Sequence, residues 1–320
     1  MKEKRPTELT LISISTQYTS DDKAREYFES LRWPDGPFCP HCGNADTDRI
    51  YKVTPNPEKK IRAGLYKCAE CREGFTVTVG TVMEDSHIPL HKWLIAFYMM
   101  CASKTQVSAL QLQRQLELGS YRSAWFMCHR IRFALKDHTP SDLLTGTVEA
   151  DETYIGGKRR GLGRAYKGNK TPVVSLIERG GRVRSQVVEN VNSKEVGKIL
   201  RRHISKDATL HTDESPIYFK PGREFANHQS VNHHQKEYVR YDRDGELVTT
   251  NTAEGFFGNS KRNISGTHRH ISRKHTDLYF AELDHKYNTR LNTDGERTSD
   301  AVSRISGKRL MLRRPRSSDK

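Results

Sequence analysis

The sequence has no long apolar run. The longest one, Trp93 to Ala102, holds ten residues, which is about half of what a helix needs to cross a bilayer. No apolar signal segment follows Met1, so nothing in the sequence predicts export. We therefore expect a soluble protein of a prokaryotic-type cytoplasm, a compartment in which disulfides are rare.

Acidic residues are outnumbered by basic ones in this chain. Asp and Glu number 39 against 54 Lys and Arg, which gives a net charge of +15 and a pI near 9.5. Such an excess favours a polyanion as the partner, although a basic protein without one is the alternative. Hydrophobic residues make up only 34% of the 320, a content that is low but still sufficient for two or three folded domains.

Cysteines are also few, and their spacing argues against disulfides. Four of the six form the pairs Cys39-Pro-His-Cys42 and Cys68-Ala-Glu-Cys71, which are separated by 25 residues. Zinc takes four thiolates tetrahedrally, and each C-x-x-C turn supplies two of them. Gly43 and Gly74 follow the pairs and suit the backbone of such turns. We predict a zinc ribbon over residues 38–85; two redox or chance pairs are the alternative.

The segments that flank the ribbon have helical periodicity. Residues 1–37 predict a helical lead-in. Residues 86–138 predict three helices, at 90–102, 108–116 and 121–135. The third helix carries the basic residues Arg122, His129, Arg130 and Arg132. A short helix, a turn with glycine and a basic helix are typical of a helix-turn-helix that binds DNA, although any three packed helices share this pattern.

From residue 145 to 292, strand and helix patterns alternate. The predicted strands are 146–155, 173–178, 182–188 and 208–212, and the predicted helices are 193–203 and 251–261. A basic, glycine-rich loop covers residues 156–170. The last segment, 293–320, is strongly basic towards its end and is predicted to be a flexible tail.

Acidic residues accompany the predicted strands and the later helix. Asp151 shares a strand with Glu149 and Glu152, and the alternation of a strand places Glu149 and Asp151 on one face. Asp213 follows a second strand, and Glu254 lies on the helix. Open α/β sheets bind ligands at the carboxyl ends of their strands, and oxygen ligands that hold two divalent ions serve phosphoryl transfer. Spacing alone also allows Asp213 to cap a turn and Glu254 to lie on a solvated helix face.

Longer motifs resemble the zinc-ribbon DDE transposases of bacterial insertion sequences. The most specific blocks are Val148–Lys158, which reads VEADETYIGGK, and Asn251–Phe257, which reads NTAEGFF. Further matches are Thr212-Asp213, Val231–His233, Glu237–Arg240, Lys261-Arg262, Gly266-Thr267 and Tyr287–Arg290. The similarity spans about residues 20–290. The sequence departs from the family pattern at Gly258–Ser260, where the family has a more apolar helix.

The resemblance implies an RNase H-like catalytic fold in which Asp151, Asp213 and Glu254 bind two Mg²⁺ or Mn²⁺ ions. Members of the family vary at the third position, so Asn251 is the substitute ligand. His233 matches a family histidine and is expected beside the active site; the alternative is a solvent-exposed histidine in the His233-His234 pair.

Basic residues near the acids are the predicted DNA contacts. Lys158, Arg159 and Arg160 lie in the basic loop. The resemblance aligns Lys261, which Arg262 follows, with a basic residue that touches DNA phosphate. Contacts of this kind make binding steeply salt-dependent. The implied partners are double-stranded element ends and target DNA, held by at least a dimer.

These observations together predict an α+β multidomain protein with an N-terminal zinc ribbon, a helix-turn-helix-like segment and an α/β RNase H-like catalytic domain. The predicted function is that of an insertion-sequence transposase. It would bind terminal inverted repeats, hydrolyse a phosphodiester at the element end and join the freed 3′-hydroxyl to target DNA. Two alternatives stay open: a non-catalytic zinc-ribbon DNA-binding regulator, and a metal-dependent nuclease without joining activity. A transposase would act in the cytoplasm, on the nucleoid.

Overall fold

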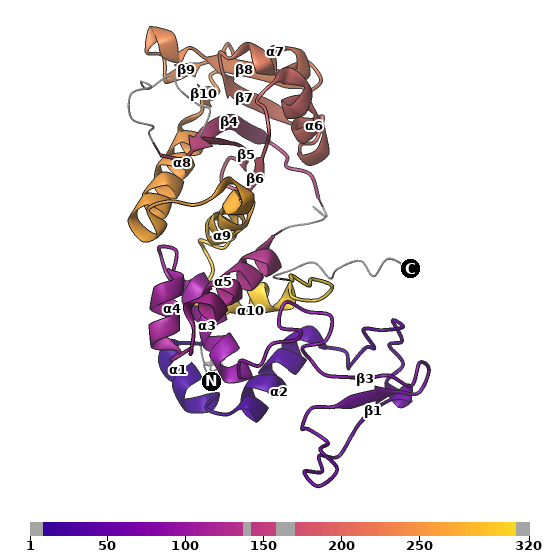
Figure 1. The fold of residues 1–320 in the computed structure, drawn as a ribbon. Coiled ribbons are helices and arrows are strands. Elements are labelled where there is room, and N and C mark those ends of the chain that lie inside the picture. Colours follow the sequence, from indigo (N-terminus) through magenta and orange to yellow (C-terminus); the bar gives the residue numbers. More distant parts are fainter. Residues whose placement is uncertain (1–8, 137–141, 158–169, 312–320) are drawn as a thin grey trace, which may run out of the picture. The chain divides into compact units, whose positions relative to one another are not determined.

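The computed structural model describes residues 9–136, 142–157 and 170–311, which fold into two compact units (Figure 1). Unit 1 comprises the chain up to Leu135 and the chain from Leu291 onward, whereas unit 2 comprises Lys136–Arg290. One hydrophobic cluster forms the core of unit 1, and two clusters lie in unit 2. None of the described helices is long and apolar enough to cross a membrane.

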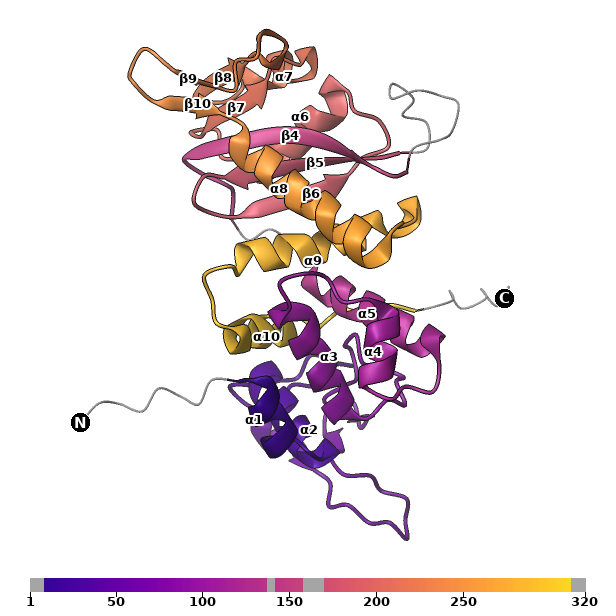
Figure 2. The same ribbon diagram turned by 90° about the vertical axis from the view of Figure 1, so that its left-hand side faces the viewer.

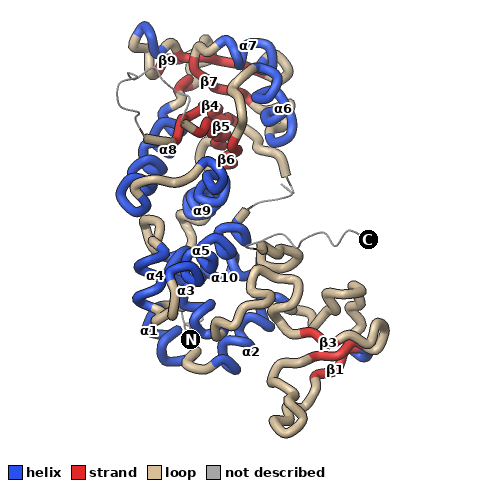
Figure 3. Tube along the Cα trace, in the orientation of Figure 1, coloured by secondary structure: helices blue, strands red, loops and turns tan. Residues whose placement is uncertain are grey.

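Unit 1 combines six helices of the described chain with a small three-stranded antiparallel sheet of order β1-β2-β3 (Figure 3). Its helices are α1 (Leu11–Gln17), α2 (Asp21–Arg32), α3 (Leu90–Ala102), α4 (Ala109–Gln115), α5 (Tyr121–Leu135) and α10 (Asp294–Ser303). Its strands are β1 (Ile50–Lys52), β2 (Tyr66–Cys68) and β3 (Gly74–Phe75). The Trp33 ring, just beyond α2, meets Tyr66 and Phe75 edge-on at centroid distances of 5.2 and 5.9 Å, and so joins the sheet to the helices.

The three helices predicted over residues 86–138 are confirmed, but the basic face of the third is not. In α5 the side chains of His129, Arg130 and Arg132 are buried, and only Arg122 of the four basic residues is exposed. The Arg130 guanidinium lies 4.5 Å from the centroid of the Phe126 ring, a cation–π contact inside unit 1. These residues serve packing, so α5 does not present the basic surface that the sequence pattern indicated.

The predicted flexible tail over 293–320 is wrong for its described part. Thr293 and Glu296 form a capping box that starts α10, and such a cap stabilises a helix by about 1 kcal/mol. Ala301, Val302 and Ile305 are fully buried in the core of unit 1. Basic residues are interspersed among these apolar ones in the sequence, so that the helical apolar stripe was not recognised. Residues 312–320 lie outside the described chain.

Unit 2 is built on a five-stranded sheet of order β6-β5-β4-β7-β8 (Figures 1 and 2). Its strands are β4 (Thr147–Ile155), β5 (Thr171–Glu178), β6 (Val183–Val187), β7 (Thr209–Asp213) and β8 (Asn227–Val231), with a separate hairpin of β9 (Val239–Tyr241) and β10 (Leu247–Thr249). Its helices are α6 (Ser193–His203), α7 (Pro216–Gly222), α8 (Asn251–Asn263) and α9 (Thr276–Asn288).

The sheet is mixed, and helices cover both of its faces. Strand β5 runs antiparallel to its neighbours β4 and β6, whereas β7 and β8 run parallel to β4. Helices α6 and α7 pack on one face through Val148, Ala150 and Leu176, and α8 and α9 pack on the other (Figure 2). Three antiparallel strands extended by parallel crossovers, with a helix layer on each side, form an RNase H-like fold.

Candidate active site

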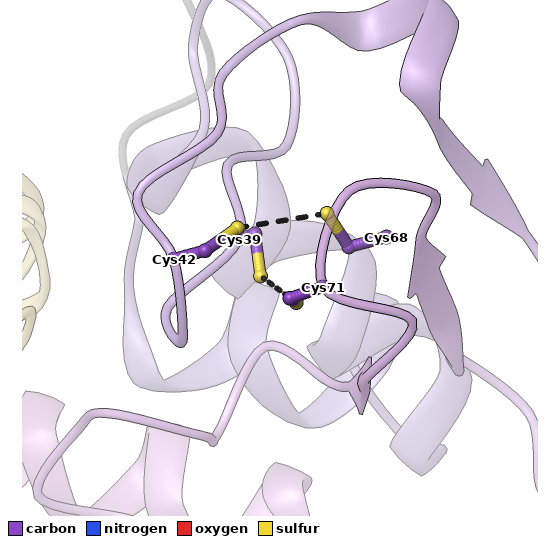
Figure 4. Close-up of side chains that lie close together, drawn as sticks. All are labelled: Cys39, Cys42, Cys68 and Cys71. Atoms are coloured by element: carbon purple, nitrogen blue, oxygen red, sulfur yellow. Dashed lines mark hydrogen bonds between the residues drawn. The ribbon is translucent and has the colours of Figure 1, made fainter.

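The four cysteines of the two C-x-x-C pairs come together in one cluster (Figure 4). The Sγ atoms of Cys39 and Cys71 lie 3.6 Å apart and those of Cys42 and Cys68 lie 3.7 Å apart, and all four lie within 4.8 Å of one another. Tetrahedral zinc with Zn–S bonds of about 2.3 Å sets its sulfurs about 3.8 Å apart. The predicted cluster is thus confirmed, and its spacing fits structural zinc.

Backbone geometry explains how each cysteine turn is held. In the first turn Gly43 adopts φ 79° and its N–H donates to the Cys39 carbonyl at 2.9 Å. In the second turn Arg72, not the predicted Gly74, takes the left-handed conformation with φ 63°. N–H groups of Cys71 and Glu70 lower the pKa of the Cys68 thiol to about 6, whereas burial and the neighbouring cysteines raise that of Cys71 to about 12, so that Cys68 ionises before Cys71.

The predicted catalytic acids come from three elements of unit 2. Parallel pairing of β4 with β7 sets Thr147 opposite Thr209 and Glu149 opposite His211, an offset of 62 residues. Continued two residues beyond the last paired position, this offset brings Asp151 level with Asp213, the last residue of β7. Glu254 lies in the first turn of α8, the helix that covers this face of β4.

The charges of these acids affect the pKa of the neighbouring acids. Burial, together with the charges of Glu152, Asp213 and Glu254, raises the pKa of Asp151 to about 7. Burial also raises the pKa of Asp213. The N–H of Ser215, which donates to the Asp213 carboxylate at 3.0 Å, lowers this pKa and offsets part of the effect. Among the described residues, however, only the cysteines form a group whose ligand atoms all lie within 4.8 Å. The charges of Asp213 and Glu254 therefore act on Asp151, although the three acids do not form a compact ligand cluster of the kind that the cysteines form.

The raised pKa of Asp151 predicts a pH-dependent stability. In the unfolded chain an Asp titrates near about 3.9, so between pH 4 and 7 the folded protein binds the extra proton. Ionised Asp151 then destabilises the fold as the pH rises, by about 4 kcal/mol as an upper bound. Without added divalent metal, Asp151→Asn should melt at a higher temperature than the wild type at pH 7.5, and the difference should fall to roughly a quarter at pH 4.5.

Asp284 and His211 also have pKa values shifted within this range, but their effects on stability are the same in the wild type and in Asp151→Asn. Burial raises the pKa of Asp284 to about 7, and burial with the nearby Arg179 lowers that of His211 to about 4. Both are present in the wild type and in the variant, so the difference in melting temperature isolates Asp151. A variant that melts below the wild type at pH 7.5 would contradict the predicted repulsion.

His233 lies beside Glu254, the predicted third acid. Its Nδ1 is 3.5 Å from Oε1 of Glu254, and its Nε2 is 3.4 Å from the Thr250 hydroxyl. The carboxylate of Glu214 accepts the backbone N–H groups of His233 and His234 at 2.9 and 3.2 Å. Glu214, which follows Asp213 directly, was not singled out in the sequence, yet it holds the turn that carries His233.

The other predicted site residues divide into two groups. Asn251 is exposed at the start of α8, and Lys261 and Arg262 are exposed near the end of the same helix, with Lys261 on the stripe of Glu254. The predicted DNA contacts Lys158, Arg159 and Arg160 lie outside the described residues.

Glu149 does not join the acidic site, although it lies on the same face of β4 as Asp151. It is fully buried, and its carboxylate binds Arg179 and the first turn of α8. The acid itself was visible in the sequence, but its partners lie 30 and more than 100 residues away. Only the tertiary structure reveals that contact.

Two sequence families match separate parts of the chain. Residues 19–73 match the transposase zinc-ribbon domain, and residues 143–288 match the ISXO2-like transposase domain. An uncharacterized protein in transposable element ISH50 of Halobacterium salinarum is 28% identical over 285 residues, an alignment that covers 82% of this chain and 89% of that protein.

Similar solved structures have low scores. A simian T-cell lymphotropic virus intasome in complex with the PP2A regulatory subunit B56 gamma has 14% identity and a TM-score of 0.29, over 60% of this chain and 65% of that chain. A pre-cleavage Mos1 transpososome has 12% identity and a TM-score of 0.20, over 66% and 77%. The fold assignment therefore rests on the strand order and on the two matched domains.

The two matched regions span well over half of the chain and coincide with the cysteine cluster and with the sheet that carries the acids. The relative from transposable element ISH50 extends the similarity across both regions. The chain carries a transposase zinc ribbon over residues 19–73 ahead of an ISXO2-like DDE transposase domain over residues 143–288, a domain of phosphoryl-transfer enzymes.

Proposed function

We propose that this transposase binds the ends of its element as double-stranded DNA and then cleaves and joins DNA at Asp151, Asp213 and Glu254. The observation that carries the proposal is the acidic site itself. Three acids come from β4, β7 and α8, and the charges of Asp213 and Glu254 add to burial and to the charge of Glu152 in raising the pKa of Asp151 to about 7. Such a donor set calls for cations with oxygen ligands.

Two Mg²⁺ or Mn²⁺ ions bound by these carboxylates would activate the attacking hydroxyl and stabilise the leaving oxygen. Asp151 and Asp213 extend from adjacent strands, so the rigid sheet sets their separation. Glu254 comes from α8, and His233 orients its carboxylate at 3.5 Å. Asn251, one turn earlier, is the reserve ligand.

The reaction has two steps at one site. In the first, a water oxygen bonds to phosphorus at the element end, the P–O3′ bond breaks, and the 3′-oxygen leaves as a hydroxyl. In the second, this 3′-hydroxyl attacks a target phosphodiester, whose own P–O3′ bond breaks. Lys261 and Arg262, exposed farther along α8, would hold the phosphates, as would Lys158, Arg159 and Arg160.

Unit 1 and a second copy of the chain would serve the assembly of the protein on DNA. The zinc ribbon and the helices of unit 1 would grip the terminal repeats, and at least a dimer would pair two ends. Because the DNA of the element and of its target lies in the nucleoid, we place the protein in the cytoplasm. The alternatives are a DNA-binding regulator without chemistry and a nuclease that does not join.

Duplexes taken from the DNA that brackets the gene test the proposal. We expect the purified protein to bind these ends in preference to unrelated duplexes, and to nick them at a fixed 3′ position when Mg²⁺ or Mn²⁺ is added. Binding that weakens steeply with salt would reflect the phosphate contacts. Binding without any cleavage would favour the regulator.

The third ligand can be tested by paired substitutions on α8. Glu254→Gln should lower cleavage by roughly 100-fold, because a lost metal ligand removes several kcal/mol of charge stabilisation. Asn251→Ala should change it only slightly if Glu254 is the ligand. Cleavage rates on an end duplex at saturating Mn²⁺ measure both. A large loss in Asn251→Ala with a small one in Glu254→Gln would move the ligand to Asn251.

A further inference from the structure

A layer of polar side chains, in which Glu149 and His211 are buried, adjoins the three acids. Glu149 precedes Asp151 by two residues on β4, and His211 precedes Asp213 by two residues on β7. Residues two apart in a strand point to the same face and lie about 6.8 Å apart along it. Thr252 likewise precedes Glu254 by two residues at the start of α8.

The Glu149 carboxylate is the centre of this layer. Its Oε2 accepts the backbone N–H groups of Thr252 and Ala253 at 2.8 and 3.1 Å, and its Oε1 accepts the Thr252 hydroxyl at 2.9 Å. A carboxylate at the N-terminus of a helix is favoured by the unpaired N–H groups and by the helix dipole. Thr250, the residue at the N-cap position, makes no side-chain cap bond, so Glu149 from β4 takes over that role.

Arg179 completes the layer from the end of β5. Its guanidinium contacts Glu149 Oε1 at 3.0 Å through Nη2 and at 3.3 Å through Nε, and its Nη2 lies 3.2 Å from Nδ1 of His211. It also donates to the carbonyls of Leu247 and Thr249, at 2.9 and 3.4 Å, in the strand that leads into α8. One ion pair, between the buried Glu149 carboxylate and the partly exposed Arg179 guanidinium, thus ties β4, β7, β10 and α8 together.

We infer that Glu149, held by Arg179, is a positioning residue that sets the place of Glu254 relative to Asp151 and Asp213. Two of the acids belong to neighbouring strands of one sheet, but Glu254 belongs to a helix and needs a link of its own. The Glu149 carboxylate bonds to the two residues just before Glu254 and stands two residues before Asp151. The inference rests on the proposed role of the acids as metal ligands.

Glu149→Gln is the sharpest substitution because both oxygens of Glu149 only accept. A Gln amide must turn its NH₂ group either towards the N–H groups of α8 or towards Arg179, and in each case a donor faces a donor. The first turn of α8 should then shift, and Glu254 with it. Glu149→Asp keeps the charge but shortens the side chain by one methylene, and serves if Glu149→Gln does not fold.

The matched control is Asp284→Asn. Asp284 of α9 also accepts a backbone N–H and a hydroxyl, both of Ser185 on β6 and both at 2.7 Å. Its contacts tie α9 to the sheet at β6 and involve none of the three acids. This control separates a general loss of packing in unit 2 from a displacement of Glu254.

Cleavage of the polypeptide by bound Fe²⁺ measures the position of Glu254 without DNA. With ascorbate and peroxide, Fe²⁺ at the site should cut the full-length wild-type chain near residues 151, 213 and 254. Glu149→Gln should keep the first two cuts and lose the third, whereas Asp284→Asn should keep all three. The Mn²⁺ concentration for half-maximal DNA cleavage should rise by about 10–100-fold in Glu149→Gln only.

The outcomes are distinguishable. Loss of the cut near residue 254 in Glu149→Gln or Glu149→Asp, with the cuts near 151 and 213 retained, supports the inference. An unchanged cutting pattern in a folded Glu149 variant overturns the inference and leaves the proposed function standing. A wild-type chain that is cut at none of the three acids overturns the proposed metal site, and the inference with it.

Discussion

Asp151→Asn should abolish both DNA cleavage and DNA joining, with rates at least roughly 1,000-fold below the wild type. Asp151 stands in the middle strand of the sheet, and the charges of three neighbouring acids act on it. An amide removes one charge of the site and one of its oxygen ligands. The measurement is the rate of nicking on an element-end duplex with Mg²⁺.

DNA binding by Asp151→Asn should stay near the wild-type level, because the proposed phosphate contacts lie on other residues. Asp207→Asn is the matched control: Asp207 is an exposed aspartate before the amino end of β7, the end opposite Asp213, and its loss should leave cleavage unchanged. Cleavage that survives in Asp151→Asn would remove this residue from the active site. An equal loss of DNA binding and cleavage would point instead to a misfolded unit.

Loss of zinc should unfold the ribbon. Metal binding contributes about 10–16 kcal/mol to the folding of four-ligand zinc peptides. Here Cys39 and Cys68 are buried in the same core as Trp33, Tyr66 and Phe75. We expect Cys68→Ser to purify without zinc and to be cut rapidly by proteases between residues 38 and 80. Its affinity for element ends should fall strongly.

A cysteine outside the cluster gives the control for that experiment. Cys128→Ala removes a buried thiol of α5 that is not part of the metal group, and should retain about one zinc ion per chain. Zinc content by elemental analysis and proteolysis time courses measure both variants. A Cys68→Ser protein that keeps its zinc and its protease resistance would contradict a structural zinc site.

Local patterns were sufficient for some elements. Helices α3 and α5 begin and end where periodicity and flanking residues predicted, and α6 does so with Asn192 as its cap. Local pattern failed where tertiary contacts decide. The edge strand β8, Asn-His-Gln-Ser-Val, has almost no apolar character, and α9 buries Glu282 and His285 among its apolar residues. Neither segment shows a periodicity that a sequence reading detects.

The acidic site was similarly predictable only in part. Asp151 and Asp213 accompany strands, and the rules of open sheets bring strand ends together. The prediction of Glu254 and His233 depended on the resemblance to the family, because no local sequence pattern indicates that a turn at 233–235 packs against the first turn of α8. The roles of Glu149 and Glu214 stayed hidden, since each binds backbone N–H groups that the fold alone brings near.

A strand-transfer assay with pre-cut element ends tests the central claim most directly. The wild-type protein is mixed with an end duplex that already carries a free 3′-hydroxyl, a plasmid target and Mg²⁺. We predict plasmid molecules covalently joined to the element end, and none with Asp151→Asn. Target cleavage without joined product would make the protein a nuclease, and end binding without either reaction would make it a regulator; both results contradict the claim.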